Sequence, residues 1–183
     1  VTAVDNCTDY INEIKLTAAA ENLPVECLET DVLSFKTNKK FDAAICLGNS
    51  FSFFNKEDTM ALLTGTADKL KPGAKFIIQT MMLTEMAIRE FKETTEGTIG
   101  EYKCNTKSIF LFDPTRVEVV YTMIAEDGTE EIKESIDYLY SYSEMTAMIQ
   151  DAGFTIRNIY SIPGRKPFTF GEPRAYFVAQ KNA

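Results

Sequence analysis

The first half of the chain alternates between two patterns of hydrophobic positions. Short runs rich in β-branched and other apolar residues predict strands at 1–5, 25–30, 41–47 and 75–81. Between these runs, apolar residues recur three or four positions apart. This spacing predicts a helix that Thr8 caps and that ends at Ala20, a second from Glu57 to Leu70, and a shorter one that Thr84 caps. Because strands alternate with helices, we expect a parallel sheet with helices on both faces.

The second half changes to a period of two. Residues Glu101 to Tyr140 alternate between apolar and polar side chains, with turns at Asp113-Pro114 and Asp127-Gly128, which predicts a three-stranded antiparallel meander. A helix capped by Ser143 and two final strands, 154–162 and 174–180, follow. We therefore expect one α/β domain, 1–183, with a Rossmann-like, doubly wound and mostly parallel sheet. The meander, 101–140, is expected to cover the carboxyl ends of its strands.

Composition narrows the classes of function. With 183 residues, of which 45% are hydrophobic, the chain is long enough to bury a core. A net charge of −8 argues against a nucleic-acid partner, and no apolar run is long enough to span a membrane. The four cysteines form no C-x-x-C pair, which is typical of reduced thiols in a cytoplasmic protein. Since the chain has no histidine, we exclude histidine-based nucleophiles and most zinc sites, and predict no metal.

Polar residues follow the predicted parallel strands at their carboxyl ends, where ligands bind in such sheets. Asp5 and Asp31 each close a strand, one strand–helix unit apart, and Gly48 breaks the chain after the third strand. A carboxylate can accept both hydroxyls of a ribose or the amine of adenine. The alternative for each acid is that it stabilises a turn, because Asp commonly ends strands. Together with Gly48, the two acids predict a nucleoside pocket.

At these residues the chain resembles the class I S-adenosylmethionine-dependent methyltransferases. The strand from Phe41 to Leu47, the loop Gly48-Asn49-Ser50-Phe51, the turn Leu70-Lys71-Pro72-Gly73-Ala74 and the late helix and strand from Tyr140 to Phe154 are similar to that family's segments, in the same order. The resemblance implies methyl transfer from S-adenosylmethionine to a small molecule. It assigns the ribose to Asp5 and Asn6, adenine to Asp31 and Val32, and the methionine moiety to Leu47, Gly48 and Asn49.

One departure from the family concerns the start of the chain. The family's G-x-G-x-G turn is not in this sequence, and Val1 to Asp5 matches the second strand of the family's sheet. We therefore expect the first strand–helix unit to be missing and S-adenosylmethionine not to be well ordered on this chain. The neighbours of a missing central strand would have unpaired backbone groups. We expect that a strand outside this sequence, a strand of another chain, or a displaced Val1 to Asp5 fills the gap.

The acceptor is not identified by the sequence. Phe51, Gln79, Tyr140, Arg116 and Arg174 are candidate substrate residues, with core packing or solvated charge as the alternative for the aromatic and basic ones. No catalytic residue is assigned; a proton acceptor, if the reaction needs one, would be Asp, Glu, Tyr or Lys. A homodimer is possible.

Other functions remain open at this point. A non-catalytic nucleotide- or ligand-binding module would show the same strand-end acids. A nicotinamide-dependent oxidoreductase is less favoured because no tyrosine is followed by lysine at the spacing Tyr-x-x-x-Lys of short-chain dehydrogenases. A DNA amino-methyltransferase is disfavoured because Asn49-Ser50-Phe51 lacks the two prolines of its motif.

Overall fold

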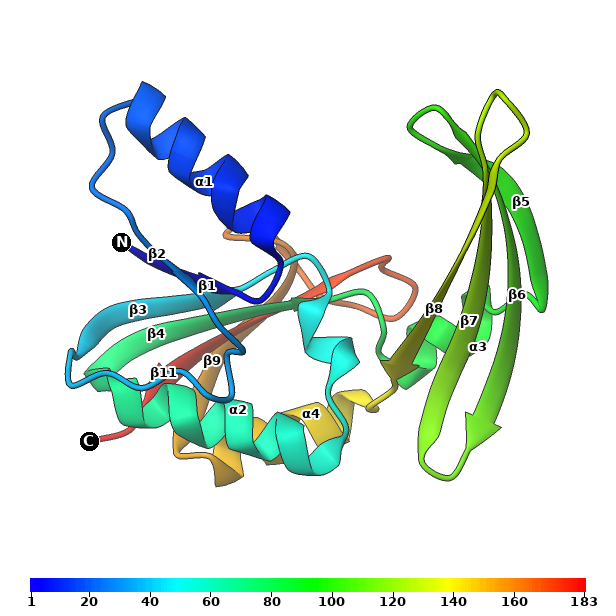
Figure 1. Ribbon diagram of the computed structural model, residues 1–183. Coiled ribbons are helices and arrows are strands. Elements are labelled where there is room, and N and C mark those ends of the chain that lie inside the picture. The colour runs from blue at the N-terminus through cyan, green and yellow to red at the C-terminus, as the bar shows by residue number, and fades with distance from the viewer.

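The computed structural model describes all 183 residues (Figure 1). The helices are α1 (Thr8–Ala20), the 3-10 helix η1 (Ser50–Phe53), α2 (Lys56–Lys69), α3 (Thr84–Glu90) and α4 (Tyr142–Asp151). The strands are β1 (Thr2–Asp5), β2 (Glu26–Glu29), β3 (Phe41–Cys46), β4 (Leu70–Thr80), β5 (Thr94–Ile99), β6 (Tyr102–Phe112), β7 (Thr115–Ile124), β8 (Glu130–Tyr138), β9 (Phe154–Ile162), β10 (Lys166–Pro167) and β11 (Ala175–Lys181). None of the helices is both long and apolar enough to cross a membrane.

The strands form three sheets rather than one. β1 and β2 pair in parallel as a two-stranded sheet, and five strands pair in the order β10-β9-β11-β4-β3. In this second sheet only β3 and β4 are parallel neighbours, because β11 runs antiparallel to both β4 and β9. The α/β class is therefore confirmed, but the single, mostly parallel sheet is not. The strands are mixed in direction, and the expected sheet is broken between β1 and β3.

The division leaves one edge of β3 without a partner strand. Ile45 is 67% exposed and Leu47 is also exposed, so the expectation that this apolar strand is covered on both faces is wrong. The hypothesis that Val1 to Asp5 moves into the gap is also wrong, because β1 stays in register with β2, with Asp5 opposite Glu29. The backbone groups along the open edge of β3 thus have no strand partner.

The main core lies in the five-stranded sheet and the two helices below it, α2 and α4 (Figure 1). This core is a cluster of 18 buried residues, and its largest fully buried side chains include Phe51, Phe76, Phe154 and Phe177. Phe76 and Phe154 pack with ring centroids 5.7 Å apart. In α1, by contrast, only Ile11 and Ala18 are buried.

The meander is a separate, four-stranded antiparallel sheet, β5 to β8. Its first strand was not predicted, because half of the residues of β5 are threonines, all of its residues are exposed, and they show no apolar alternation. The segment that contains the meander begins after β4 and ends before α4, and its two ends lie side by side. There the Thr84 N–H donates to the Tyr140 carbonyl at 3.1 Å. Figure 1 shows the meander beyond the carboxyl ends of β3 and β4.

Three predicted helix caps are wrong by one or two residues. Cys7 rather than Thr8 is the N-cap of α1, and Leu83 rather than Thr84 is that of α3, in both cases without a side-chain bond. For α4 the N-cap is Ser141 rather than Ser143. The reason is the glutamate at Glu144, three residues after Ser141, which completes a capping box with it.

Candidate functional site

The residues predicted to bind the cofactor lie along one edge of the molecule. β1, β3 and β4 run in the same direction in Figure 1, so their carboxyl ends point to the same side, toward the meander. Asp5 closes β1, Gly48 and Asn49 follow β3, and Gln79 is the next-to-last residue of β4. The strand-end arrangement expected from the sequence is therefore present.

The turn after β3 is held rigidly against β4. Gly48 and Asn49 both have positive φ, at 73° and 66°, and both donate their backbone N–H to Gln79 Oε1, at 2.8 and 3.3 Å. Asn49 Oδ1 accepts from Thr80 Oγ1 at 3.2 Å and from the Met81 N–H at 2.8 Å. A side chain added at Gly48 would meet no atom within 4 Å, so the surface beside this glycine is open.

The two strand-end acids each stabilise the turn that follows them. Asp5 Oδ1 accepts from the Cys7 N–H at 2.8 Å, and Asp31 Oδ1 accepts from the Leu33 N–H at 2.7 Å. The turn-stabilising alternative is thus right for one oxygen of each carboxylate. The other oxygen of each has no hydrogen-bond partner in the protein and can accept from a ligand. Asn6 beside Asp5 is exposed, and Val32 packs against the main core.

Most of the candidate substrate residues make structural contacts. Phe51 is 1% exposed within the main core, and Gln79 holds the turn after β3. Tyr140 donates its hydroxyl to the Phe54 carbonyl at 2.9 Å. Arg116 on β7 pairs with Glu118 at 2.8 Å, whereas Arg174, just before β11, is exposed and has no ion-pair partner. Their role in binding a substrate stays a prediction.

Burial shifts the pKa of two groups close to this edge. It raises the pKa of the Cys46 thiol to about 11, so this thiol is protonated at neutral pH and is a poor nucleophile. It also raises the pKa of Tyr140 above its ordinary value. Nowhere do three metal-ligating side chains come together.

The sequence reasoning missed a polar connection between the cofactor-side turn and the meander. Asn49 Nδ2 donates to Ser52 Oγ at 2.9 Å, and the Ser52 hydroxyl lies within hydrogen-bond distance of Asp137 Oδ1 on β8. The signal that was available is the alternation along β8, where apolar and polar side chains point to opposite faces of the strand. Its apolar Ile132 and Ile136 are exposed, while Asp137 and Ser135 lie on the opposite face, toward the molecule. An inward polar face on a strand indicates a polar surface inside.

Comparisons with known proteins identify the fold. Residues 1–73 match the family model described as a methyltransferase domain. A structure of an S-adenosylmethionine-dependent methyltransferase from Clostridium acetobutylicum ATCC 824 is similar over 100% of this chain and 75% of its own, with a TM-score of 0.87 at 16% identity. The CcbJ methyltransferase from Streptomyces caelestis covers the same shares, with a TM-score of 0.85 at 15% identity.

A third structure is that of CalS10, an amino pentose methyltransferase from Micromonospora echinaspora with S-adenosylmethionine bound. It covers 100% of this chain and 74% of its own, with a TM-score of 0.64 at 17% identity. No curated protein matches the sequence. The resemblance inferred from the sequence is confirmed: residues 1–73 match the methyltransferase domain model, and the chain as a whole has the fold of the S-adenosylmethionine-dependent methyltransferases.

Proposed function

We propose that the protein transfers a methyl group from S-adenosylmethionine to a small-molecule acceptor. The observation that carries this proposal is the edge where Asp5, Asp31 and the Gly48-Asn49 turn meet, within and beside the 1–73 segment that matches a methyltransferase domain. Two proteins with a similar fold act on small molecules: CalS10 is an amino pentose methyltransferase, and KedS8 is a sugar N-methyltransferase. The acidic chain, with a net charge of −8, is suited to such an acceptor rather than to nucleic acid.

The residues at this edge fit the cofactor's parts. Asp5 has one carboxylate oxygen free for the ribose hydroxyls, and Asp31 has one free for the adenine amine. Val32 supplies apolar surface beside Asp31, and Asn6 is exposed beside Asp5. The surface at Gly48, flanked by Leu47 and Asn49, is open and leaves space for the methionine moiety.

The chemistry asks little of the protein beyond orientation. When bound, S-adenosylmethionine supplies a sulfonium methyl group, whose carbon bonds to the acceptor's lone pair while the electron pair of the broken C–S bond stays on sulfur. Holding the acceptor in line with that bond can contribute several kcal/mol, on the order of 7–11 in favourable systems. The turn fixed by Gln79 and Asn49 provides a rigid wall for this alignment. A chain without histidine can therefore carry out the reaction.

The alternatives from the sequence are separated by ligand binding. A methyltransferase should be stabilised against heat by S-adenosylmethionine, a nicotinamide-dependent oxidoreductase by a reduced nicotinamide nucleotide, and a non-catalytic module by ligand without turnover. The cytoplasmic location is part of the proposal and is supported by the four cysteines, which are all free thiols.

The deciding experiment is a titration of the full-length protein with S-adenosylmethionine. Asp5→Ala should weaken binding by about 1–3 kcal/mol, the scale of charged hydrogen bonds left unmade. Asp151→Ala, at the end of α4 and away from this edge, is the matched control and should bind as the wild type does. Equal affinity of the Asp5 variant and the control would remove Asp5 from the site.

The possible homodimer is proposed to form through the meander. Ile109, Val120, Ile132 and Ile136 are exposed and lie on the face of the sheet opposite α3. Packing these four apolar side chains against a second copy would remove them from water, and the charged residues beside them, such as Lys107 and Glu134, could pair across the interface. Ile136→Lys should then convert a dimer to a monomer in light scattering, whereas Leu16→Lys on the exposed side of α1 should not. A wild-type protein that is monomeric at all concentrations would contradict this proposal.

A further inference from the structure

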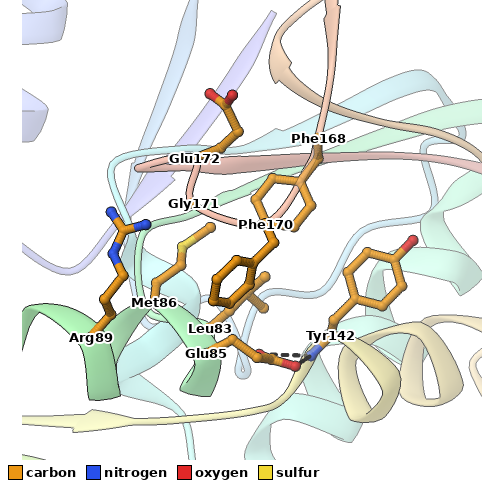
Figure 2. Close-up of a pocket in the computed structure, with 9 residues that line it drawn as sticks. All are labelled: Leu83, Glu85, Met86, Arg89, Tyr142, Phe168, Phe170, Gly171 and Glu172. Atoms are coloured by element: carbon orange, nitrogen blue, oxygen red, sulfur yellow. Dashed lines mark hydrogen bonds between the residues drawn. The ribbon is translucent and has the colours of Figure 1, made fainter.

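A pocket lies between α3, the start of α4 and the loop that joins β10 to β11 (Figure 2). Its volume is about 150 Å³. An apolar cavity of roughly this volume holds a single benzene ring. The floor is formed by Leu83 and Met86, both buried, and the walls by Tyr142, Phe168 and Phe170. The size and lining of the pocket fit one six-membered ring.

Two of the aromatic residues form one flat wall. The rings of Tyr142 and Phe168 stack on each other, with an angle of 14° and centroids 6.1 Å apart. Phe170, at the mouth, is 83% exposed. Its loop is brought close to α3 at Gly171, where an added side-chain carbon would lie 3.0 Å from Arg89 Nη1. Figure 2 shows Phe170 pointing from this loop toward Leu83 and Glu85 on the opposite side.

The charges around the pocket leave one carboxylate without a cation. Arg89 is neutralised by Glu90, with its Nη2 at 2.7 Å from Glu90 Oε1, and Glu172 is paired with Lys166. Glu85 accepts only from the backbone N–H of Tyr142, at 3.0 and 3.2 Å. A cationic ligand group beside Glu85 would complete this pairing and would also face aromatic rings, which attract cations.

The pocket opens at the same edge as the predicted cofactor residues. Leu83 comes two residues after Met81, whose N–H is bonded to Asn49. The loop that carries Phe168 and Phe170 follows β10, which pairs with the carboxyl end of β9, and β9 is parallel to β4 because β11 is antiparallel to both. A ligand in the pocket is therefore held beside the edge where the methyl donor is proposed to bind.

We propose that this pocket binds the ring of a small amine, with the ring packed against Tyr142, Phe168 and Phe170 and the ammonium group at Glu85. In calling this amine the anchoring part of the methyl acceptor, the inference rests on the proposed function. Binding of the amine itself does not depend on S-adenosylmethionine. The two proposals can therefore fail separately.

The test uses benzylamine as the probe and benzyl alcohol as its neutral counterpart, both without cofactor. With ¹³C-labelled methionine methyl groups, either probe should shift the resonance of Met86, which Met86→Leu identifies by its loss. Benzylamine should bind about two- to fivefold more tightly than benzyl alcohol, the factor expected from an ion pair at the exposed Glu85. Equal affinity of the two probes, or an unchanged Met86 resonance, would overturn the inference.

Three variants sharpen the result. Glu85→Gln keeps an oxygen for the Tyr142 N–H, and should reduce benzylamine affinity about two- to fivefold while leaving benzyl alcohol unaffected. Phe170→Ala should weaken both probes several-fold. Phe112→Ala removes a ring that is 82% exposed on the meander, and as the matched control should change neither. If Glu85→Gln binds benzylamine like the wild type, the ammonium is not at Glu85 and the proposal is wrong. If S-adenosylmethionine does not bind but benzylamine does, only the methyl transfer fails.

Discussion

The unit formed by β1, α1 and β2 differs sharply from the five-stranded sheet in how it is held. The five-stranded sheet shares an 18-residue core with α2 and α4, whereas α1 buries only Ile11 and Ala18 and its sheet has two strands. Asp5 and the segment leading to Asp31 belong to the sparsely packed unit, while the Gly48-Asn49 turn is bonded to the well-packed sheet. The nucleoside side of the proposed site is thus the adaptable one, and the methionine side is preorganised.

The largest expected effect tests where the stability lies. Phe177 in the middle of β11 is fully buried, so Phe177→Ala should lower the free energy of unfolding by about 3–5 kcal/mol, through lost burial and the cavity left behind. Urea denaturation measures it, with exposed Phe170→Ala as the control, expected within about 0.5 kcal/mol of the wild type. A loss below about 1 kcal/mol for Phe177→Ala would mean that the five-stranded sheet is not the stable half.

A smaller effect tests the preorganised turn. Asn49→Ala removes both acceptor bonds to β4 and leaves the buried Thr80 hydroxyl without Asn49, which should cost about 1–3 kcal/mol of unfolding free energy. Asn22→Ala is the matched control, because Asn22 also has a positive φ, of 54°, but makes no side-chain bond. The two variants share the backbone strain, so their difference measures the side-chain network. Equal losses would show that the turn is held by its backbone alone.

The sequence predicted the strand and helix order because periodicity follows from which faces are buried. β9 was located to the residue, and α1 to within one residue at its start. The gap between β1 and β3 was expected from the missing glycine turn. Of the three ways expected to fill it, the displacement of β1 is wrong, since β1 pairs with β2 and strand pairing depends on contacts distant in sequence. Asp5 and Asn49 were predicted as site residues because each follows from the local pattern at the end of a strand. Asp137 and the pocket at Phe170 were not predicted, because their neighbours are far apart in the chain.

Helix starts provide the next comparison. Ser141 and Glu144 cap α4 reciprocally, so Ser141→Ala should lower stability by about 1 kcal/mol. Ser143→Ala, two residues further along the chain, should have little effect because the Ser143 hydroxyl reaches no backbone N–H. Thermal unfolding of the two variants decides between the cap predicted from the sequence and the one in the structure. A larger loss for Ser143→Ala would restore the predicted cap.

The converse change should strengthen the sparsely packed unit. Cys7 is the N-cap of α1 in an extended conformation and makes no side-chain cap bond. Cys7→Ser supplies a hydroxyl that can accept from the first turn, and should stabilise α1 by about 0.5–1 kcal/mol. Amide hydrogen exchange in α1 would report it as slower exchange, with the exchange of β11 unchanged. Unaltered exchange in α1 would show that packing rather than capping limits this helix.

The smallest effect is a change of stability with pH that begins only in the alkaline range. Burial raises the pKa of Tyr140 in the folded protein above its ordinary value. The folded state therefore holds this proton more tightly than the unfolded state, and the resulting contribution is present below about pH 10 and is lost as the pH rises through the folded pKa. Urea denaturation of Tyr140→Phe should show a weaker loss of stability above about pH 10 than the wild type. Exposed Tyr10→Phe, as the control, should follow the wild type.

The meander enters and leaves the molecule at a single point. The Thr84 N–H bonds to the Tyr140 carbonyl, and Leu83 pairs with Tyr140 as an isolated bridge, so the two ends of the inserted segment touch. An insertion whose ends meet can change in length or shape without shifting the strands it interrupts. Here that segment also carries Glu85, Met86 and Asp137. If the proposed function is right, exchanging this one segment would give the proposed methyl-donor site a new acceptor, with no strand of the five-stranded sheet altered.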